Sequence, residues 1–360
     1  MNKDSNIYIA GHRGLVGSAI LENLCGKGYK NIILRTHSEL DLINQSAVND
    51  FFAKEKPEYV FLAAAHVGGI MANNKDRGDF IYQNLMIQSN VIHASYIYGV
   101  KKLLFLGSTC IYPGKAPQPM PETCLLTSPL EYTNEPYAIA KIAGIKMCES
   151  YNLQYNTNYI AVMPANLYGP NDNFNLETSH VLPAIIRKIY LANCLYSADY
   201  SALRADLNKR PINKVNGNAT NEEIVAVLDR YGVRTKEVEI WGTGKPLREF
   251  VWSEEMADAC VYIMNKVNFD DLRPKEGAIR NTHINIGTGK DISIKDLAFL
   301  IKRIVGYQGE LRFNPDKPDG TFRKLTDISK LHHIGWHHSI EIEEGISRLY
   351  TWYLTNNENN

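Results

Sequence analysis

Two residues in the stretch Asn134–Lys141 could carry acid–base chemistry. Tyr137 and Lys141 are four positions apart, so on a helix they lie on one face, one turn from each other. A neighbouring ammonium favours the ionised form of a phenol, whose pKa is ordinarily about 10. Lowering that pKa to about 7 takes on the order of 4 kcal/mol. Such a tyrosine could give a proton to a carbonyl oxygen while a hydride reaches the carbonyl carbon, although the same spacing also fits a surface pair.

Two further reactive residues follow an apolar run. Ser108 and Cys110 come directly after residues 102–107. Alternate residues of a strand share a face, so both side chains would project into one pocket if the strand geometry persists. Ligands bind at the carboxyl ends of strands in doubly wound sheets. We expect Ser108 to donate to a substrate carbonyl beside Tyr137; the alternative is a hydroxyl that only caps the strand.

A glycine triplet near the N-terminus predicts a dinucleotide-binding turn. Gly11, Gly14 and Gly17 lie between the apolar run 7–10 and a helical pattern over 18–26. In this context glycines let the backbone approach a pyrophosphate, which rests on the helix N-terminus. NAD-binding proteins usually carry an acid after the second strand, where this chain has Arg35, and Arg13 lies inside the glycine loop. The pattern therefore predicts NADP as cofactor, unless Arg35 only points to solvent.

Apolar runs alternate with helical patterns through the first half of the chain. The runs cover 7–10, 31–35, 59–63, 102–107 and 159–163, and the helices cover 18–26, 45–54, 79–98 and 137–155. Apolar strands that alternate with helices predict an α/β fold, a doubly wound parallel sheet of the Rossmann type. After residue 163 shorter elements, including a helix over 256–265 and a strand over 283–287, predict a smaller α+β domain. We expect an NADP-binding domain over 1–180, to which later segments return, and a substrate-binding domain over 181–350.

Composition excludes several functional classes. Lys+Arg and Asp+Glu number 39 each, so nothing indicates binding to nucleic acid or to an anionic membrane surface. The six cysteines are scattered without a zinc-like spacing, so no metal site is expected. No apolar stretch reaches membrane-spanning length. These features predict a cytoplasmic protein with reduced thiols.

The motifs together resemble the extended short-chain dehydrogenase/reductase family and, more closely, the GDP-L-fucose synthases within it. The matching runs are Ile9–Gly14, Val67–Ile70, Asp79–Asn84, Leu103–Pro113, Thr133–Ile145, Met163–Pro170, Ser179–Val181, Trp241–Gly244, Arg248–Phe250, Ile284–Gly289 and Lys317–Gly320. The similarity extends nearly from end to end. It implies C3/C5 epimerisation of GDP-4-keto-6-deoxy-D-mannose followed by NADPH-dependent reduction at C4, which gives GDP-L-fucose.

The resemblance also implies roles for individual residues. The catalytic set is Ser108, Tyr137 and Lys141 for reduction, with Cys110 and His180 for proton exchange at C3 and C5. Cofactor contacts fall on Gly11, His12, Arg13, Gly14, Leu15, Val16, Gly17, Arg35, His37, Asp41, Leu42, Ala63, Ala64, Leu106, Gly107, Lys141, Pro164, Asn166, Leu167 and His180. Substrate contacts fall on Lys188, Trp241, Arg248 and Asp319. Without the resemblance, Cys110 would read as a buried small residue, His180 as a loop histidine, Trp241 as core and Arg248 as a surface ion pair.

Two departures from the family pattern leave alternatives open. His37 stands where the family often has an arginine, which weakens the 2′-phosphate clamp. The segment 195–236 is longer than the family's usual connection and predicts an added helical pair of unassigned role. Three alternatives remain. The chain could act on a GDP-4-keto-6-deoxy-heptose, it could reduce its substrate without epimerisation, or it could be a non-catalytic NADP-binding protein. The resemblance further implies a homodimer through helices at about 79–98 and 137–155.

Overall fold

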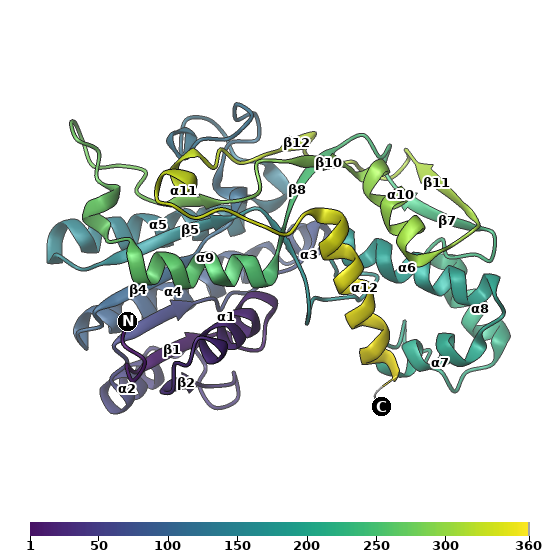
Figure 1. The fold of residues 1–360 in the computed structure, drawn as a ribbon, viewed down its shortest axis with the longest axis horizontal. Helices are drawn as coiled ribbons and strands as arrows, with labels where there is room; N and C mark the ends of the chain where they lie inside the picture. Colours follow the sequence, from purple (N-terminus) through teal and green to yellow (C-terminus); the bar gives the residue numbers. More distant parts are fainter. Residues whose placement is uncertain (359–360) are drawn as a thin grey trace. The chain divides into compact units, whose positions relative to one another are not determined.

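The computed structural model describes residues 1–358 in two compact units (Figure 1). The first unit comprises Met1–Leu167, Glu249–Lys290 and Lys324–Ser339. The second comprises Tyr168–Arg248, Asp291–Arg323 and the chain from Ile340 onward. Within residues 1–358, no helix combines the length and the apolar character needed to cross a bilayer. The same residues contain no group of three or more His, Cys, Asp or Glu side chains that could hold a metal ion.

The first unit is built on a six-stranded parallel sheet. Its strands, in spatial order, are β2 (Ile32–Leu34), β1 (Ile7–Ala10), β3 (Tyr59–Leu62), β4 (Lys102–Leu106), β5 (Tyr159–Pro164) and β9 (Ile284–Ile286). Every neighbouring pair is parallel, so all carboxyl ends meet at one edge. The predicted doubly wound fold class is confirmed.

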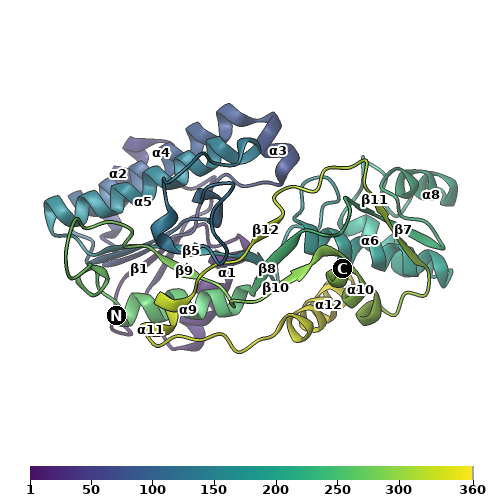
Figure 2. The same cartoon turned by 90° about the horizontal axis from the view of Figure 1, so that it is seen from above.

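Helices cover both faces of this sheet (Figure 2). One layer contains α2 (Gln45–Glu55), α4 (Arg77–Ile97) and α5 (Glu135–Tyr155), and the other contains α1 (Leu15–Gly26), α9 (Ser253–Lys266) and α11 (Ser329–His333). In β1, Tyr8 and Ala10 join the first core, while Ile7 and Ile9 join the second. Because both faces are buried, the strands are mostly apolar rather than alternating, with Lys102 and Asn285 as buried polar exceptions.

Two elements predicted for the second domain lie in the first unit instead. Helix α9 packs on α1, and β9 adds to the sheet beside β5. The residues of β9 are fully buried, with Asn285 between two isoleucines. A three-residue strand carries no information about which sheet it joins, so its position was not predictable from periodicity.

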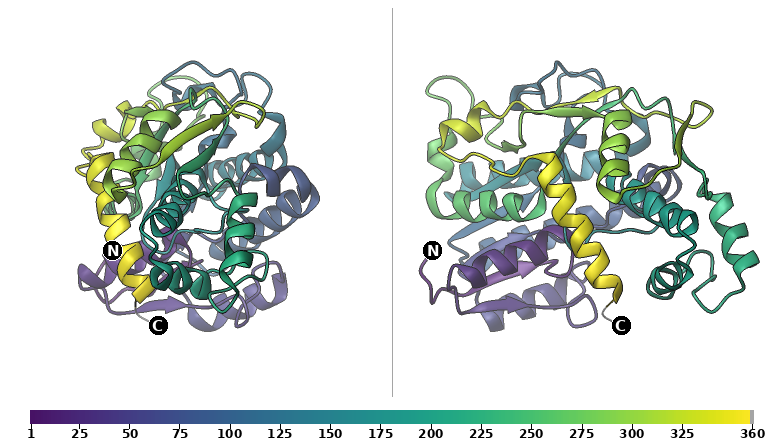
Figure 3. Two further views of the ribbon diagram at one scale, coloured as in Figure 1. Left: turned by 90° about the vertical axis from the view of Figure 1, so that its right-hand side faces the viewer. Right: turned by 45° about the vertical axis from the view of Figure 1, so that its right-hand side comes forward.

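The second unit is smaller and mainly helical. Its helices are α6 (Val181–Tyr196), α7 (Tyr200–Lys209), α8 (Asn221–Arg230), α10 (Ile294–Val305) and α12 (Ile342–Glu358), and its strands β7 (Glu237–Trp241) and β11 (Glu310–Asn314) are parallel (Figure 3). Helix α6 contacts α10, α7 and β7. The helical pair predicted within 195–236 is confirmed as α7 and α8.

A further small sheet is formed by short strands in the order β10 (Asp291–Ser293), β8 (Leu247–Trp252) and β12 (Arg323–Lys324), and β6 (Asn166–Tyr168) pairs with β8. The remaining short helix, α3 (Ile70–Lys75), precedes α4 in the first unit.

Candidate functional site

The turn between β1 and α1 leaves no room for side chains at two of its glycines. A Cβ atom on Gly17 would lie 2.1 Å from the carbonyl oxygen of Gly11, and one on Gly11 would lie 2.7 Å from the backbone nitrogen of Ala64. Gly11 also has a φ of +86°, which favours glycine. Gly14 is the N-cap of α1, without a side-chain cap on the helix N–H groups. The turn therefore fits a pyrophosphate.

The same turn offers a further polar atom. Nδ1 of His12 is buried and has no hydrogen-bond partner. Burial lowers the pKa of His12, so its ring is neutral near pH 7 and one nitrogen can donate. Leu15 and Val16 begin the helix itself, with Val16 packed against the core of the first unit. These observations agree with a cofactor phosphate held at the start of α1.

The charged residues that follow β2 make contacts within the protein. Arg35 donates through Nη2 to Glu55 Oε1 at 2.6 Å and through Nη1 to the carbonyl of Leu34. Arg35 therefore does not simply point to solvent. Its guanidinium already donates to Glu55 and to the Leu34 carbonyl, so fewer of its N–H groups are available to a ligand. His37 is highly exposed and lies 3.8 Å from Asp41. Arg13 is exposed in the glycine loop.

Most other predicted cofactor residues lie along the carboxyl edge of the sheet. Ala63 and Ala64 follow β3, Leu106 ends β4 and precedes Gly107, Pro164 ends β5, and Asn166 and Leu167 begin β6. Leu42 differs, because its side chain is buried in the core and only its backbone is available for a ligand. Its carbonyl accepts a hydrogen bond from Asn90 at 2.9 Å.

Ser108 and Cys110 lie together, but for another reason than a shared strand face. β4 ends at Leu106, and residues 109–111 form a 3₁₀ turn with Ser108 as its N-cap. Ser108 Oγ accepts a hydrogen bond from the Cys110 backbone N–H at 3.3 Å. The expectation that the strand geometry persists was wrong, because the hydroxyl caps the turn that follows. Burial raises the pKa of the Cys110 thiol, while Ser108, Lys324 and Lys141 act in the opposite direction.

Tyr137 and Lys141 lie one turn apart on α5, as their spacing predicts. Lys141 Nζ donates to the carbonyl of Leu106 at 2.9 Å and lies 5.7 Å from the centroid of the Tyr137 ring. Burial lowers the pKa of Lys141 to about 8. Burial also raises the pKa of Tyr137, with Cys110 adding to the effect, so the ammonium does not lower it here as expected. Tyr137 is thus protonated near pH 7, which is the state that a proton donor requires.

His180 is the one predicted catalytic residue that belongs to the second unit. It is the N-cap of α6, at the end of a loop that begins after β6. Its side chain is exposed to solvent. Desolvation by the surrounding protein nevertheless lowers the pKa of the imidazole. The imidazole is therefore neutral near pH 7 and can accept a proton.

The predicted substrate residues Lys188 and Trp241 lie together in the second unit. Trp241 is 48% exposed, which excludes the alternative that it belongs to the core. Lys188 Nζ lies 5.9 Å from the centre of the indole and donates to the carbonyl of Glu239 at 3.0 Å. Burial lowers the pKa of Lys188 to about 8. Lys317 was missed by the sequence analysis although its motif was noted, and its ammonium lies 5.3 Å from the same ring.

Arg248 and Asp319 complete this group in different ways. Arg248 Nη1 donates to the carbonyl of Leu247 at 2.7 Å, and desolvation lowers its pKa while Asp319 raises it. Asp319 accepts hydrogen bonds from the backbone N–H and the hydroxyl of Thr243, both at 2.7 Å. Its carboxylate thereby shapes the turn after Trp241. The exposed ring, two ammonium groups and a guanidinium suit an aromatic base that carries phosphates.

Replacing Gly17 by alanine tests the glycine turn. The added Cβ meets the carbonyl of Gly11 at 2.1 Å, so the turn has to shift. We expect Gly17→Ala to weaken binding of the expected cofactor, NADPH, at least about tenfold, measured by calorimetry. Gly26→Ala, on the same helix with nothing within 4 Å of the new Cβ, is the control and should bind like the wild type. Equal affinities for both variants would contradict this role of the turn.

Comparison with known proteins agrees with this arrangement. The profile of the NAD dependent epimerase/dehydratase family matches residues 7–207 and 211–287. GDP-L-fucose synthase 1 of Arabidopsis thaliana is 49% identical over 355 residues, which cover 99% of this chain and 95% of that protein. A solved GDP-6-OMe-4-keto-L-xylo-heptose reductase from C. jejuni is 48% identical with a TM-score of 0.93, and 99% of each chain is covered. A GDP-D-glycero-L-gluco-heptose synthase from Campylobacter jejuni, solved in the presence of NADPH, is 47% identical with a TM-score of 0.87, again covering 99% of each chain. The chain therefore belongs to the NAD dependent epimerase/dehydratase family, and GDP-L-fucose synthases are among its relatives.

Proposed function

We propose that this chain is an NADP(H)-dependent GDP-sugar 3,5-epimerase/4-reductase that converts GDP-4-keto-6-deoxy-D-mannose into GDP-L-fucose. The observation that carries the proposal is the grouping of Ser108, Cys110, Tyr137 and Lys141 where β4 meets α5, in a chain 49% identical to a GDP-L-fucose synthase. A non-catalytic cofactor-binding protein would have no use for all four residues. The grouping supports an enzyme that moves protons while a hydride passes from the cofactor to the sugar.

Reduction at C4 is assigned to Tyr137, Lys141 and Ser108. NADPH, when bound, supplies the hydride. Tyr137 is protonated and gives its proton to the C4 oxygen, while the Ser108 hydroxyl donates a hydrogen bond to the same oxygen. Lys141 remains largely charged at pH 7 and stabilises the phenolate that results.

Epimerisation at C3 and C5 is assigned to Cys110 and His180. The C4 carbonyl acidifies the protons on both neighbouring carbons, and inversion needs a base on one face and an acid on the other. Neutral His180 can accept a proton, and the protonated Cys110 thiol can return one. Burial keeps the thiol protonated, and the nearby Lys141 stabilises the thiolate that is left when the thiol gives up its proton.

Recognition of the GDP moiety is assigned to the second unit. Trp241 stacks on the guanine or ribose, and Arg248 contacts the diphosphate, with Lys188 and Lys317 adding positive charge. Asp319 acts through the Thr243 turn rather than as a free carboxylate.

Cofactor preference is assigned to Arg13 and, less directly, to Arg35. Arg13 is exposed beside the glycine turn, and Arg35 is held by Glu55 near the end of β2. Two guanidinium groups there favour a 2′-phosphate, and the heptose synthase solved in the presence of NADPH supports the same choice. The six cysteines are free thiols, which supports a reducing compartment such as the cytoplasm.

A homodimer through α4 and α5 is part of the proposal. Both helices carry large apolar side chains that are exposed, and Tyr96 of α4 stacks on Tyr155 of α5 with ring centroids 4.2 Å apart. The exposed residues on these two helices are Tyr82, Ile97, Ile139, Leu153 and Tyr155. A second copy presenting the same two helices would bury this surface in a four-helix contact.

A GDP-4-keto-heptose is a second candidate substrate. The two solved heptose enzymes are as similar to this chain as the plant GDP-L-fucose synthase is, at 47–48% against 49% identity. The two candidates are distinguished by measuring kcat/KM for the 4-keto-6-deoxy GDP-hexose and for the corresponding GDP-heptose. NADPH oxidation is the readout of turnover for both sugars. We expect turnover of the hexose to be at least as efficient. Turnover of the heptose alone would overturn the fucose assignment.

Two single variants test the division of labour. In heavy water, Cys110→Ser should lose deuterium incorporation at C3 and C5 while NADPH-dependent reduction of the 4-keto sugar persists. Tyr137→Phe should reduce hydride transfer about 10²–10⁴-fold, because it removes the proton donor, while deuterium still enters the sugar. NADPH oxidation and NMR of the sugar measure the two steps separately. Equal losses of both steps in both variants would refute separate roles.

One charged substitution tests the dimer. Leu153→Glu places a carboxylate on the exposed apolar surface of α5, where Leu153 is 51% exposed. We expect sedimentation velocity to show a monomer for this variant and a dimer for the wild type. Val225→Glu on α8, where Val225 is 43% exposed, is the matched control and should remain dimeric. A wild-type monomer, or a dimeric Leu153→Glu variant, would exclude this interface.

A further inference from the structure

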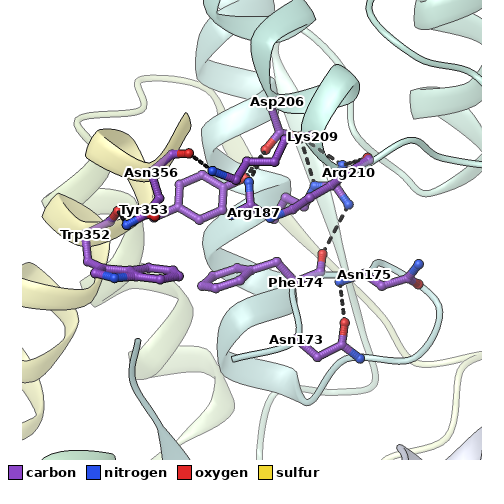
Figure 4. A network of polar contacts seen from close by, with 10 residues as sticks. All are labelled: Asn173, Phe174, Asn175, Arg187, Asp206, Lys209, Arg210, Trp352, Tyr353 and Asn356. Carbon is purple, nitrogen blue, oxygen red and sulfur yellow. Dashed lines mark hydrogen bonds and ion pairs between the residues drawn. The ribbon is translucent and has the colours of Figure 1, made fainter. Parts of the chain in front are cut away.

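A fully buried ion pair lies beside the loop that ends at His180 (Figure 4). Arg187 on α6 and Asp206 on α7 both have no exposed surface. Arg187 Nε and Nη2 donate to Asp206 Oδ1 at 3.0 and 2.9 Å. Burial of two charges carries a large desolvation penalty, so such a pair is weak evidence for stability by itself. Its other contacts indicate what it does.

The guanidinium of Arg187 also holds the loop backbone. Its Nη1 donates to the carbonyl oxygen of Phe174 at 3.2 Å, and its Nη2 donates to the carbonyl of Arg210. Phe174 precedes His180 by six residues, and Arg187 follows it by seven. This single hydrogen bond therefore closes a stretch of chain with His180 near its centre.

The side chain of Phe174 is fixed in the same place. Its ring is buried, with centroids 4.7 Å from Tyr353 and 6.3 Å from Trp352 on α12 (Figure 4). The guanidinium of Arg210 lies over the ring at 5.3 Å. The loop is thus held through both the backbone and the side chain of one residue.

Asp206 connects these contacts. Its Oδ2 accepts hydrogen bonds from the hydroxyl of Tyr353 and, at 3.4 Å, from Arg210 Nη1. Without the Asp206 carboxylate, Arg187 would be a buried charge without its counterion, and Tyr353 would lose its acceptor. We call Phe174, Arg187, Asp206, Arg210 and Tyr353 the anchor cluster.

A second contact joins the segment 195–236 to the same loop. The hydroxyl of Tyr231 donates to Glu177 Oε1 at 2.5 Å, and Asn213 Nδ2 donates to that hydroxyl at 2.9 Å. Asp206, Asn213 and Tyr231 all belong to the segment whose role the sequence left unassigned. The segment therefore contacts the loop at Glu177 directly and at Phe174 through Arg187, three and six residues before His180.

We propose that Asp206 is a positioning residue that holds His180 for proton exchange, acting through Arg187 and Phe174. This inference rests on the role proposed for His180. The basic atom of a general base has to lie within about 2.6–3.2 Å of the heavy atom that carries the proton, and a misplacement of about 1 Å costs on the order of 10²-fold in rate. The segment 195–236 thus sets the efficiency of epimerisation rather than covering the substrate.

The test compares proton exchange with reduction in one sample. Asp206→Asn removes the charge and keeps the size of the side chain. We expect the ratio of deuterium entry at C3 and C5 to NADPH oxidation to fall at least about tenfold, because the residues assigned to reduction lie in the first unit. Arg204→Met is the matched control: Arg204 is also on α7 but donates to the carbonyls of Gly217 and Ala219 and to Asn221. It should keep the wild-type ratio.

A double variant separates positioning from stability. Arg187→Met with Asp206→Leu removes both charges, which in buried pairs is often neutral or stabilising, but leaves the Phe174 carbonyl without its donor. We expect the double variant to melt no lower than Asp206→Asn, in which the Arg187 charge stays buried without its counterion, and to show a lowered ratio. A wild-type ratio in the double variant and in Asp206→Asn, or an equal fall in Arg204→Met, would overturn the inference. Absence of deuterium entry in the wild type would instead overturn the proposed function, and this inference with it.

Discussion

One hydrogen bond joins helix α5 to the end of strand β4. Lys141 Nζ donates to the carbonyl of Leu106 at 2.9 Å, and the lysine is buried. A buried ammonium that lost this acceptor would carry a cost of about 1–3 kcal/mol or more. The contact fixes Tyr137 one turn away, and it fixes both residues beside the turn that carries Ser108 and Cys110. The positions of the proposed proton donor and thiol thus follow from the place where one helix meets one strand.

Desolvation at this point determines the protonation states on which the proposed chemistry depends. Burial raises the pKa of Tyr137 and of Cys110 and lowers that of Lys141 to about 8. Two proton donors and one cation are therefore present near pH 7. In the second unit, the lowered pKa of His180 leaves a neutral base. Desolvation thus gives Tyr137, Cys110 and His180 the states that their proposed roles require, whereas Lys141 keeps most of its charge at pH 7 in spite of it.

Local patterns predicted the part of the site that depends on spacing. Glycines at fixed offsets predicted the turn whose closest approaches leave no room for a Cβ atom, and the four-residue spacing predicted the shared face of Tyr137 and Lys141. The apolar runs predicted a sheet buried on both faces, which the two cores confirm. Each of these features is fixed by residues close together in the chain.

Contacts between distant residues were not predictable in the same way. Arg35 lies after β2 as expected, but it pairs with Glu55, twenty residues further on. Part of its guanidinium is therefore bound to a carboxylate of the protein. Strand β9 joins the first sheet through pairing with β5, which its short run does not specify. The contact of Asp206 with Arg187 depends on how α7 packs on α6, and no periodicity encodes it. The sequence therefore indicated the reacting groups better than the residues that hold them.

Proton exchange without hydride transfer tests the central claim most directly. The wild-type protein is incubated with the 4-keto-6-deoxy GDP-hexose in heavy water with NADP⁺ in place of NADPH, and the sugar is followed by NMR. If Cys110 and His180 act before and apart from Tyr137, deuterium enters C3 and C5 while C4 stays a ketone. If the same preparation oxidises NADPH with this sugar but incorporates no deuterium at either carbon, the account of two separable steps is wrong.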